Sequence, residues 1–142
     1  MEHPFAGYSL LDHPADLGIE AFGRNLAEAF EQAALALISV ILDPDKITCS
    51  QSKEVIIEGA DYEQLLVRWL AEVLYLYDGQ NFAGGNFDIS ELSSTGLKAR
   101  VLGEPFDLDR HRPRLDVKAI TYHQLLLKED DSGAKIRVYL DI

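Results

Sequence analysis

Apolar residues recur at steps of three and four in two segments of this chain, and at steps of two in much of the remainder. In the first segment the apolar face consists of Leu26, Phe30, Ala33, Leu37 and Val40. This spacing places the five side chains on one side of a helix. Asn25 precedes the segment and Glu28 follows three positions later, which is typical of a capping box. The pattern predicts a helix that begins after Asn25 and ends before Pro44.

The second helical segment has a wider apolar face. Its members are Leu65, Leu66, Trp69, Leu70, Val73, Leu74 and Tyr77. Asp61 stands at the N-cap position with Gln64 three residues later, and Gly79 follows the last apolar residue. Both predicted helices are apolar on one side, so we expect each of them to pack against a sheet.

Short strands are predicted for most of the remaining chain. The segments are 8–12, 17–22, 55–58, 87–92, 97–102, 117–121, 125–128 and 135–142. The last alternates cleanly, with Ile136, Val138, Leu140 and Ile142 on one face. Helices early and hairpins late predict an α+β fold, in which two main helices pack on a mostly antiparallel β-sheet in a single-domain sandwich over residues 1–142. A doubly wound fold is disfavoured, because strict alternation of strand and helix is missing.

Composition and charge narrow the functional classes. The chain has 142 residues, of which 47% are apolar and 26% charged, as in an ordinary globular domain. With 24 acidic against 13 basic residues its net charge is −11, which disfavours non-specific nucleic-acid binding and favours cations and basic protein surfaces. The single cysteine, Cys49, excludes a disulfide within the chain. We see no secretory signal or membrane span, and therefore expect a cytoplasmic protein.

The segment from Asp12 to Gly18 is the first candidate for chemistry, since the usual nucleophile and phosphate-loop signatures are absent. Asp12, His13 and Asp16 could provide half of a cation site. Pro14 and Gly18 fit equally well with an ordinary turn in which Asp and His cap backbone amides. The spacing by itself favours the turn.

The C-terminus is the second candidate. Asp141 is followed directly by Ile142, so a side-chain carboxylate and the terminal carboxylate are neighbours. Two such charges repel unless a cation or a donor lies between them, and hard cations accept mixed oxygen ligands. Asp16 completes the set if the last strand lies beside the first ones. The alternative is a frayed terminus, which the apolar alternation through Leu140 and Ile142 disfavours.

A basic stretch formed by Arg110, Arg112 and Arg114 is the third candidate. It could contact a phosphate, a nucleotide or an acidic partner surface. A solvated loop balanced by Asp109 and Asp116 explains the same residues equally well.

Tyr122 and His123 are the fourth candidate, at the exit of the strand predicted for 117–121. They could face a cleft as a polar pair. Half-buried strand positions with satisfied hydrogen bonds are the more common explanation. No nucleophile is near in sequence, and no catalytic role is predicted.

The ordered set of motifs resembles the archease family over nearly the whole chain. The matching segments are Asp12-His13-x-Ala15-Asp16-x-Gly18-Ile19, Leu26-x-Glu28-Ala29-Phe30, the second helix with Trp69, Gly103-Glu104, Asp107, His111, Pro113, Val117-Lys118-Ala119-Ile120-Thr121-Tyr122-His123 and Leu140-Asp141-Ile142. Pro14 departs from the family pattern, where threonine is expected, so a hydroxyl beside the cation site is missing.

The resemblance implies a small α+β fold and a non-catalytic role. Archeases are protein cofactors of the GTP-dependent RNA splicing ligase, which joins ends bearing a 2′,3′-cyclic or 3′-phosphate, as in tRNA splicing. They stimulate guanylylation of the ligase, speed multiple turnover and relax its nucleotide preference. The family's cation site maps onto Asp16, Asp141 and Ile142, with Ca²⁺ as the expected divalent cation and Mg²⁺ or Mn²⁺ as alternatives. The expected partner is the ligase, with RNA contacted only indirectly or transiently and no membrane involved.

Two other functional classes remain open at the level of sequence. One is a metal-dependent hydrolase of phosphate esters that uses His13, Asp16 and His123. The other is a chaperone-like interaction module, which requires the apolar helix faces to be exposed.

Overall fold

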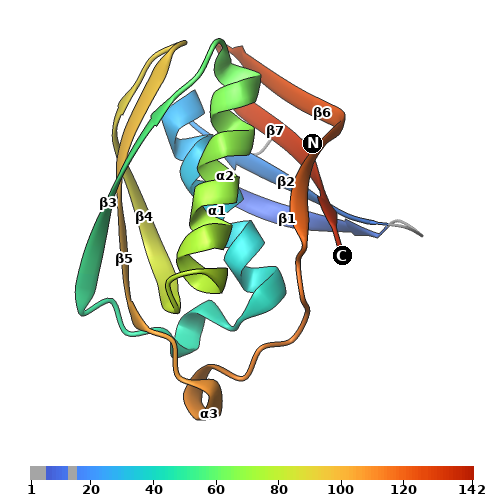
Figure 1. Ribbon diagram of the computed structural model, residues 1–142. Helices are drawn as coiled ribbons and strands as arrows, with labels where there is room; N and C mark the ends of the chain where they lie inside the picture. Colours follow the sequence, from blue (N-terminus) through green and yellow to red (C-terminus); the bar gives the residue numbers. More distant parts are fainter. Residues whose placement is uncertain (1–5, 13–15) are drawn as a thin grey trace.

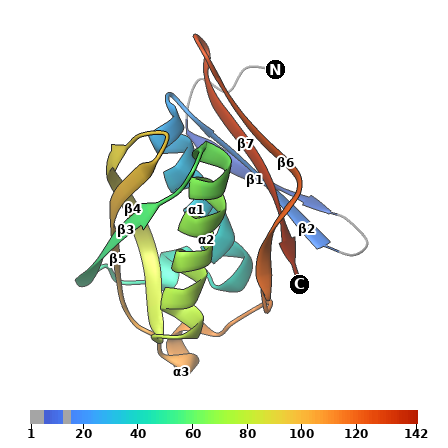
Figure 2. The same ribbon diagram turned by 45° about the horizontal axis from the view of Figure 1, so that its top comes forward.

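Two antiparallel β-sheets enclose a layer of helices in the computed structural model, which describes residues 6–12 and 16–142 (Figures 1 and 2). The four-stranded sheet has the order β1-β2-β7-β6 and the three-stranded sheet the order β3-β5-β4. The strands are β1 Gly7–Asp12, β2 Asp16–Gly23, β3 Gln51–Glu58, β4 Phe82–Leu92, β5 Gly96–Pro105, β6 Ala119–Asp130 and β7 Gly133–Asp141. The helices are α1 Leu26–Ile41, η1 Pro44–Lys46, α2 Tyr62–Asp78 and α3 Leu108–His111.

Helix α1 lies between the sheets, against β2 and β7 on one side and β4 on the other (Figure 2). Its buried residues are Leu26, Ala29, Phe30, Ala33, Ala34, Ala36, Leu37, Ile38, Val40 and Ile41. A helix that is apolar on more than one side is stable only when it is covered on each of them. Its N-terminus is fixed twice, because the Glu28 amide donates to Asn25 Oδ1 at 2.9 Å and the Leu26 amide to Glu129 Oε2 at 3.0 Å.

Helix α2 packs through its predicted apolar face. Trp69 is fully buried, its Nε1–H donates to the Phe30 carbonyl at 3.0 Å, and its ring meets Phe87 edge-on with centroids 6.1 Å apart. The Gln64 amide donates to Asp61 Oδ1 at 2.8 Å, so the predicted cap is confirmed. None of the helices in the described ranges has the length and apolar character needed to cross a lipid bilayer.

The structure confirms the predicted α+β class and the helices, and refines their arrangement. The helices lie between two sheets, whereas the sequence analysis expected them on one. The strands predicted for 117–121 and 125–128 belong to one strand, β6, which begins only at Ala119. Gly84 and Gly85 lie inside β4 at a β-bulge, where the register shifts before Asn86.

Candidate functional site

The outer face of the four-stranded sheet, opposite the helices, contains the predicted acidic residues. β7 places Ala134, Ile136, Val138 and Leu140 in the core. Successive side chains of a strand point to opposite faces, so Asp141 lies on the outer face. In β2, Leu17 and Ile19 contribute to the core, and Asp16 therefore shares the outer face with Asp141.

Asp16 and Asp141 are cross-strand partners at one end of this sheet. β2 and β7 are antiparallel neighbours, and their register pairs Asp16 with Asp141 and Leu17 with Leu140. Directly opposite side chains on one face of an antiparallel pair are in contact range, and like charges in such a pair destabilise the sheet. Asp16 is half-buried and Asp141 is exposed. The fold thus brings together two carboxylates that are 125 positions apart (141 − 16) in the sequence.

The C-terminal residue is held next to this pair. β7 ends at Asp141, and Ile142 follows it with 37% of its surface exposed. The Lys118 amide donates to the Asp141 carbonyl at 2.8 Å, which fixes the end of the strand to the segment entering β6. The predicted alternation is confirmed as far as Leu140, whereas Ile142 lies beyond the strand. The terminal carboxylate is consequently one residue from the aspartate pair. We call Asp16, Asp141 and the Ile142 carboxylate the acidic tip.

An aromatic layer lies beside the acidic tip on the same face. Gly18 is opposite Tyr139 in the register, and a Cβ atom at Gly18 would be only 2.8 Å from Tyr139 Cε1. Glycine therefore lets the Tyr139 ring lie flat on the sheet, where it is 8% exposed. The His123 ring contacts Tyr139 with centroids 6.1 Å apart. The absence of a side chain at position 18 thus makes room for the ring of Tyr139.

His123 reaches this layer through a bulge in β6. The register between β6 and β7 shifts between Thr121 and Leu126, and Gln124 has a φ of 50°. Thr121 Oγ1 donates to the Tyr139 carbonyl at 3.0 Å and accepts from the His123 amide at 3.2 Å. Tyr122 is 56% exposed at the bulge. Thr121 and His123 therefore have structural contacts with Tyr139. Among the described residues, no second base that would favour a catalytic role lies beside them.

The donor set of the acidic tip fits a hard divalent cation. Two side-chain carboxylates and a terminal carboxylate offer only oxygen ligands, which Ca²⁺ accepts with loose geometry and Mg²⁺ or Mn²⁺ also accept. Over the ranges that the structure describes, no group of three or more His, Cys, Asp or Glu side chains is placed to hold a metal. Asp16 and Asp141 are the side-chain members of the predicted set, and the Ile142 carboxylate is its third member. His13 and Pro14 lie outside the described residues.

A buried carboxylate, Glu104 in β5, forms a second polar cluster, in a different sheet from the acidic tip. Glu104 Oε2 accepts from the Thr48 amide at 2.9 Å and from His111 Nε2 at 2.8 Å, and Oε1 accepts from Arg110. The Asp107 amide donates to His111 Nδ1 at 2.9 Å, so the neutral ring has its proton on Nε2, facing Glu104. Burial opposes ionisation, but the bonds from Thr48, His111 and Arg110 outweigh it and lower the pKa of Glu104 to about 2.

The three arginines of the basic stretch make hydrogen bonds within the chain, so we assign them a structural role. Arg110 binds Glu104, Arg112 Nε donates to the Asp109 carbonyl at 3.1 Å, and Arg114 Nη2 donates to the Leu42 carbonyl at 2.6 Å. Arg114 thereby binds a carbonyl at the C-terminus of α1, where a cation also complements the helix dipole. Each arginine has a partner within the chain, which favours the solvated-loop interpretation over a phosphate site.

The contact between Glu104 and His111 was not predictable from the sequence, although both residues belong to the matched motifs. The seven-residue spacing across Pro105 and the short helix α3 gives no periodic signal, because a four-residue helix is too short to show one. The available sign of a buried polar cluster was Glu104 next to Pro105 and Phe106, with His111 following in an otherwise solvated stretch.

A family model and two sequence relatives all indicate the same protein family. The model of the archease protein family matches residues 8–142. The protein archease of Sulfolobus acidocaldarius is 40% identical over 136 residues, covering 95% of this chain and 98% of that protein. The protein archease of Methanosarcina barkeri is 36% identical over 139 residues and covers 95% of both chains.

Solved structures agree with these relatives. The solution structure of protein 1598 of Methanobacterium thermoautotrophicum superposes with a TM-score of 0.81 at 31% identity, covering 96% of this chain and 99% of that one. The crystal structure of an archease from Thermotoga maritima, described as a possible chaperone, gives a TM-score of 0.63 at 21% identity, covers 93% and 94% of the two chains, and supports the fold alone. With its motifs, its fold and its relatives in agreement, this chain belongs to the archease family.

Proposed function

We propose that this protein is a non-catalytic cofactor of the GTP-dependent RNA splicing ligase, and that it activates guanylylation and multiple turnover of the ligase through the acidic tip. The observation that supports this most is the register of β2 and β7, which sets Asp16 opposite Asp141 at the end of a sheet. A like-charge pair at a strand end costs stability unless a cation or a partner is bound there. Such an arrangement is more readily explained by function than by folding.

Each group of the tip has a distinct part in the proposal. Asp16 and Asp141 bind a divalent cation, Ca²⁺ in the first instance, together with the terminal carboxylate of Ile142. The hydrogen bond from the Lys118 amide to the Asp141 carbonyl holds this end in place. When bound, the cation supplies positive charge that can neutralise phosphate oxygens. The exposed side chain of Asp141 lets the tip approach the nucleotide pocket of the ligase, where positioning of the triphosphate favours in-line reaction.

Multiple-turnover RNA joining by the ligase of the same organism tests the proposal. The protein is prepared with its native C-terminus, and joining is followed with and without it. The variants Asp16→Asn and Asp141→Asn keep the side-chain shape but remove the charge. We expect wild type to increase turnover and both variants to lose most of this stimulation.

Asp88→Asn is the matched control, because Asp88 is an exposed carboxylate in β4 of the other sheet. It removes the same charge and is expected to stimulate like wild type. A chain extended by two residues beyond Ile142 tests the terminal carboxylate separately, and is expected to lose stimulation. Full stimulation by Asp141→Asn would contradict the proposal.

A chaperone-like interaction module is a second candidate, in keeping with the description of the Thermotoga maritima relative. In this chain the helix faces that the sequence offered for client binding are buried, including Trp69 and Leu70. Such an activity must therefore use another surface. Suppression of client aggregation that is unchanged in Asp16→Asn would favour this class.

A metal-dependent hydrolase using His13, Asp16 and His123 is the remaining alternative. His123 packs against Tyr139, and the structure describes no nucleophile beside it. Hydrolysis of a phosphate ester by the purified protein, lost in Asp16→Asn, would support this class over the cofactor role.

A further inference from the structure

The free edge of β3 offers open backbone hydrogen-bonding groups. β3 is the outer strand of the three-stranded sheet, and its register with β5 pairs Ile57 with Leu97 and Glu58 with Gly96. The Gly59 amide donates to the Thr95 carbonyl at 3.1 Å, which identifies the odd-numbered residues as those bonded to β5. The amide and carbonyl groups of Glu54, Ile56 and Glu58 therefore point away from the sheet.

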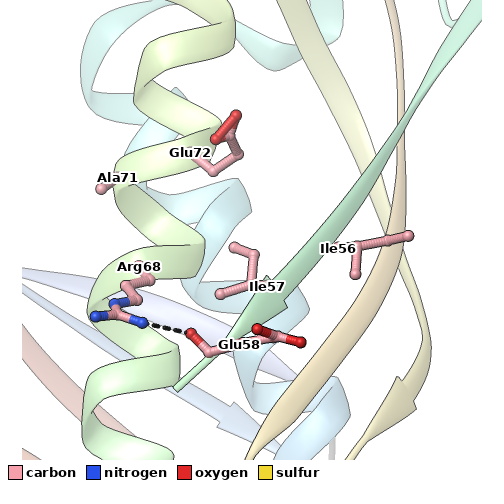
Figure 3. A pocket seen from close by; sticks show the side chains of 6 residues that line it. All are labelled: Ile56, Ile57, Glu58, Arg68, Ala71 and Glu72. Atoms are coloured by element: carbon pink, nitrogen blue, oxygen red, sulfur yellow. Dashed lines mark hydrogen bonds between the residues drawn. The ribbon is translucent and has the colours of Figure 1, made fainter. Parts of the chain in front are cut away.

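Arg68 of α2 already uses one of these groups. Its Nη1 donates to the Glu58 carbonyl at 2.6 Å, in the place that the amide of a neighbouring strand would occupy (Figure 3). Within the described ranges, no other element donates to or accepts from the outward groups of Glu54 and Ile56. Arg68 thus occupies the outward carbonyl at the C-terminal end of β3. The outward backbone groups from Ser52 to Ile56 remain available to an added strand.

A groove beside this edge has room for an extended chain. It measures about 530 Å³ and is lined by Ile56, Ile57, Glu58, Arg68, Ala71 and Glu72. Figure 3 shows Ile57 directed toward α2 and Ile56 directed to the other side of the strand. Ile56 is 71% exposed, the largest exposure among the large apolar residues of the described chain. Ala71 is small, and so leaves space beside the strand for an inward-facing side chain.

Charge decides between a second copy of this chain and a different partner. Glu54, Ile56 and Glu58 alternate on the outer face of β3 and are all exposed. Arg100 lies opposite Glu54 and Lys98 opposite Ile56 in β5, so these basic residues are one strand in from the edge. Two antiparallel copies of β3 that pair about Ile56 would set Glu54 of one copy opposite Glu58 of the other, and each chain has a net charge of −11. Like charges opposite each other across strands are destabilising, whereas opposite charges stabilise the pair. A basic segment is favoured over a second copy.

We propose that the β3 edge binds an extended basic segment of a partner protein as an added antiparallel strand. The segment has basic residues opposite Glu54 and Glu58 and an apolar residue opposite Ile56. Backbone hydrogen bonds supply affinity, and the alternate side chains supply selectivity. This edge belongs to a different sheet from Asp16 and Asp141, and its test needs neither the ligase nor a cation, so that failure of one proposal leaves the other intact.

A synthetic peptide of the sequence Thr-Lys-Thr-Val-Thr-Lys-Thr, blocked at both ends, is the probe. Its binding is followed by amide chemical shifts and by hydrogen exchange of the whole protein. We expect slower exchange at the outward amides of Glu54 and Ile56, while the amides already bonded to β5 change little. The peptide with glutamate in place of both lysines is the charge control, and we expect it to bind about tenfold more weakly or worse.

Two variants separate the backbone from the charge contribution. Ile56→Pro removes the outward amide and leaves every bond to β5 in place, because proline is tolerated on edge strands where the amide faces solvent. The double variant Glu54→Lys with Glu58→Lys changes only exposed side chains, and we expect it to prefer the glutamate peptide. Equal binding of both peptides by wild type, or protection on an element other than β3, would overturn the proposal.

Discussion

The acidic tip and the Glu104 cluster show two different uses of carboxylates in one small fold. Glu104 is buried and receives hydrogen bonds from Thr48, His111 and Arg110, all within the chain. At the tip, the register sets one carboxylate, Asp16, directly opposite another, Asp141. The first arrangement stabilises the native state by itself. The second places two like charges side by side, which a bound cation would offset, and this is why we propose a function for the tip.

The arginines of the basic stretch lie near Glu104 and the end of α1. Arg110 binds the buried Glu104, whereas Arg114 binds the Leu42 carbonyl at the end of α1. In the register, Asp141 has Asp16 of β2 on one side and the uncharged Ala119 of β6 on the other. The two arginines therefore support the structure around Glu104 and the end of α1.

Substitution of the two carboxylates by alanine gives the largest expected contrast. Glu104→Ala leaves the Thr48 amide and His111 without their acceptor in a buried site, and we expect a loss of about 3 kcal/mol in the free energy of unfolding. Asp141→Ala removes an exposed charge from a repulsive pair, and we expect a change within about 0.5 kcal/mol. Urea unfolding of the two variants measures both, and equal losses would contradict the contrast.

Acid unfolding tests the same contrast through protonation. The pKa of Glu104 is lowered from its ordinary value of 4.5 to about 2, so the folded state favours the ionised form. This stabilisation is present above pH 4.5 and is lost as the pH falls toward 2, for a total of about 3 kcal/mol. Glu104→Gln removes it. We expect the stability of wild type and of Glu104→Gln to converge in acid, whereas parallel pH curves would show that Glu104 gains nothing from its donors.

Calcium addition tests the tip. A cation that binds only the folded state adds about 2.7 kcal/mol to the free energy of unfolding at one hundred times its dissociation constant. We expect Ca²⁺ to raise the urea midpoint of wild type and to leave that of Asp141→Asn unchanged. Asp88→Asn is the control and should respond as wild type does. A similar response of all three proteins would place the cation elsewhere.

Gly18→Ala has the smallest expected effect and tests the packing beside the tip. The added methyl group would be 2.8 Å from Tyr139 Cε1 and 3.1 Å from Leu11 Cβ. Because Tyr139 is buried, the ring must shift, and we expect a loss of about 1–2 kcal/mol in the free energy of unfolding. Pairing with Tyr139→Leu in a double-mutant cycle isolates the clash. Additive losses would show that Gly18 is not matched to the ring.

Local patterns predicted the helices well, since caps and periodicity are properties of neighbouring residues. Asn25 and Asp61 both cap as expected. The position of α1 between two sheets does not follow from its main apolar face alone; Ala34 and Ile38 add apolar surface on other sides of the same helix. Residues 117 and 118 were assigned to a strand because Val117 is apolar, and it is buried without being in one.

The candidate site is formed by residues that are distant in sequence, so local patterns could not predict it in full. The sequence could pair Asp16 with Asp141 only on the condition that the last strand lies beside the first ones, and the register supplies that condition. The bulge that turns His123 toward Tyr139 has no local signal, because Gln124 adopts a positive φ without a glycine. The donors of Glu104 come from Thr48 and from residues six and seven positions later, which no periodicity joins.

The rate of ligase guanylylation tests whether the acidic tip activates the ligase. Radiolabelled GTP, the ligase and Ca²⁺ are combined with wild type, Asp141→Asn or Asp88→Asn, each with a native C-terminus. We expect wild type and Asp88→Asn to accelerate guanylylation equally, and Asp141→Asn to do so by less than about a tenth as much. Equal acceleration by Asp141→Asn would show that the tip is not the activating group.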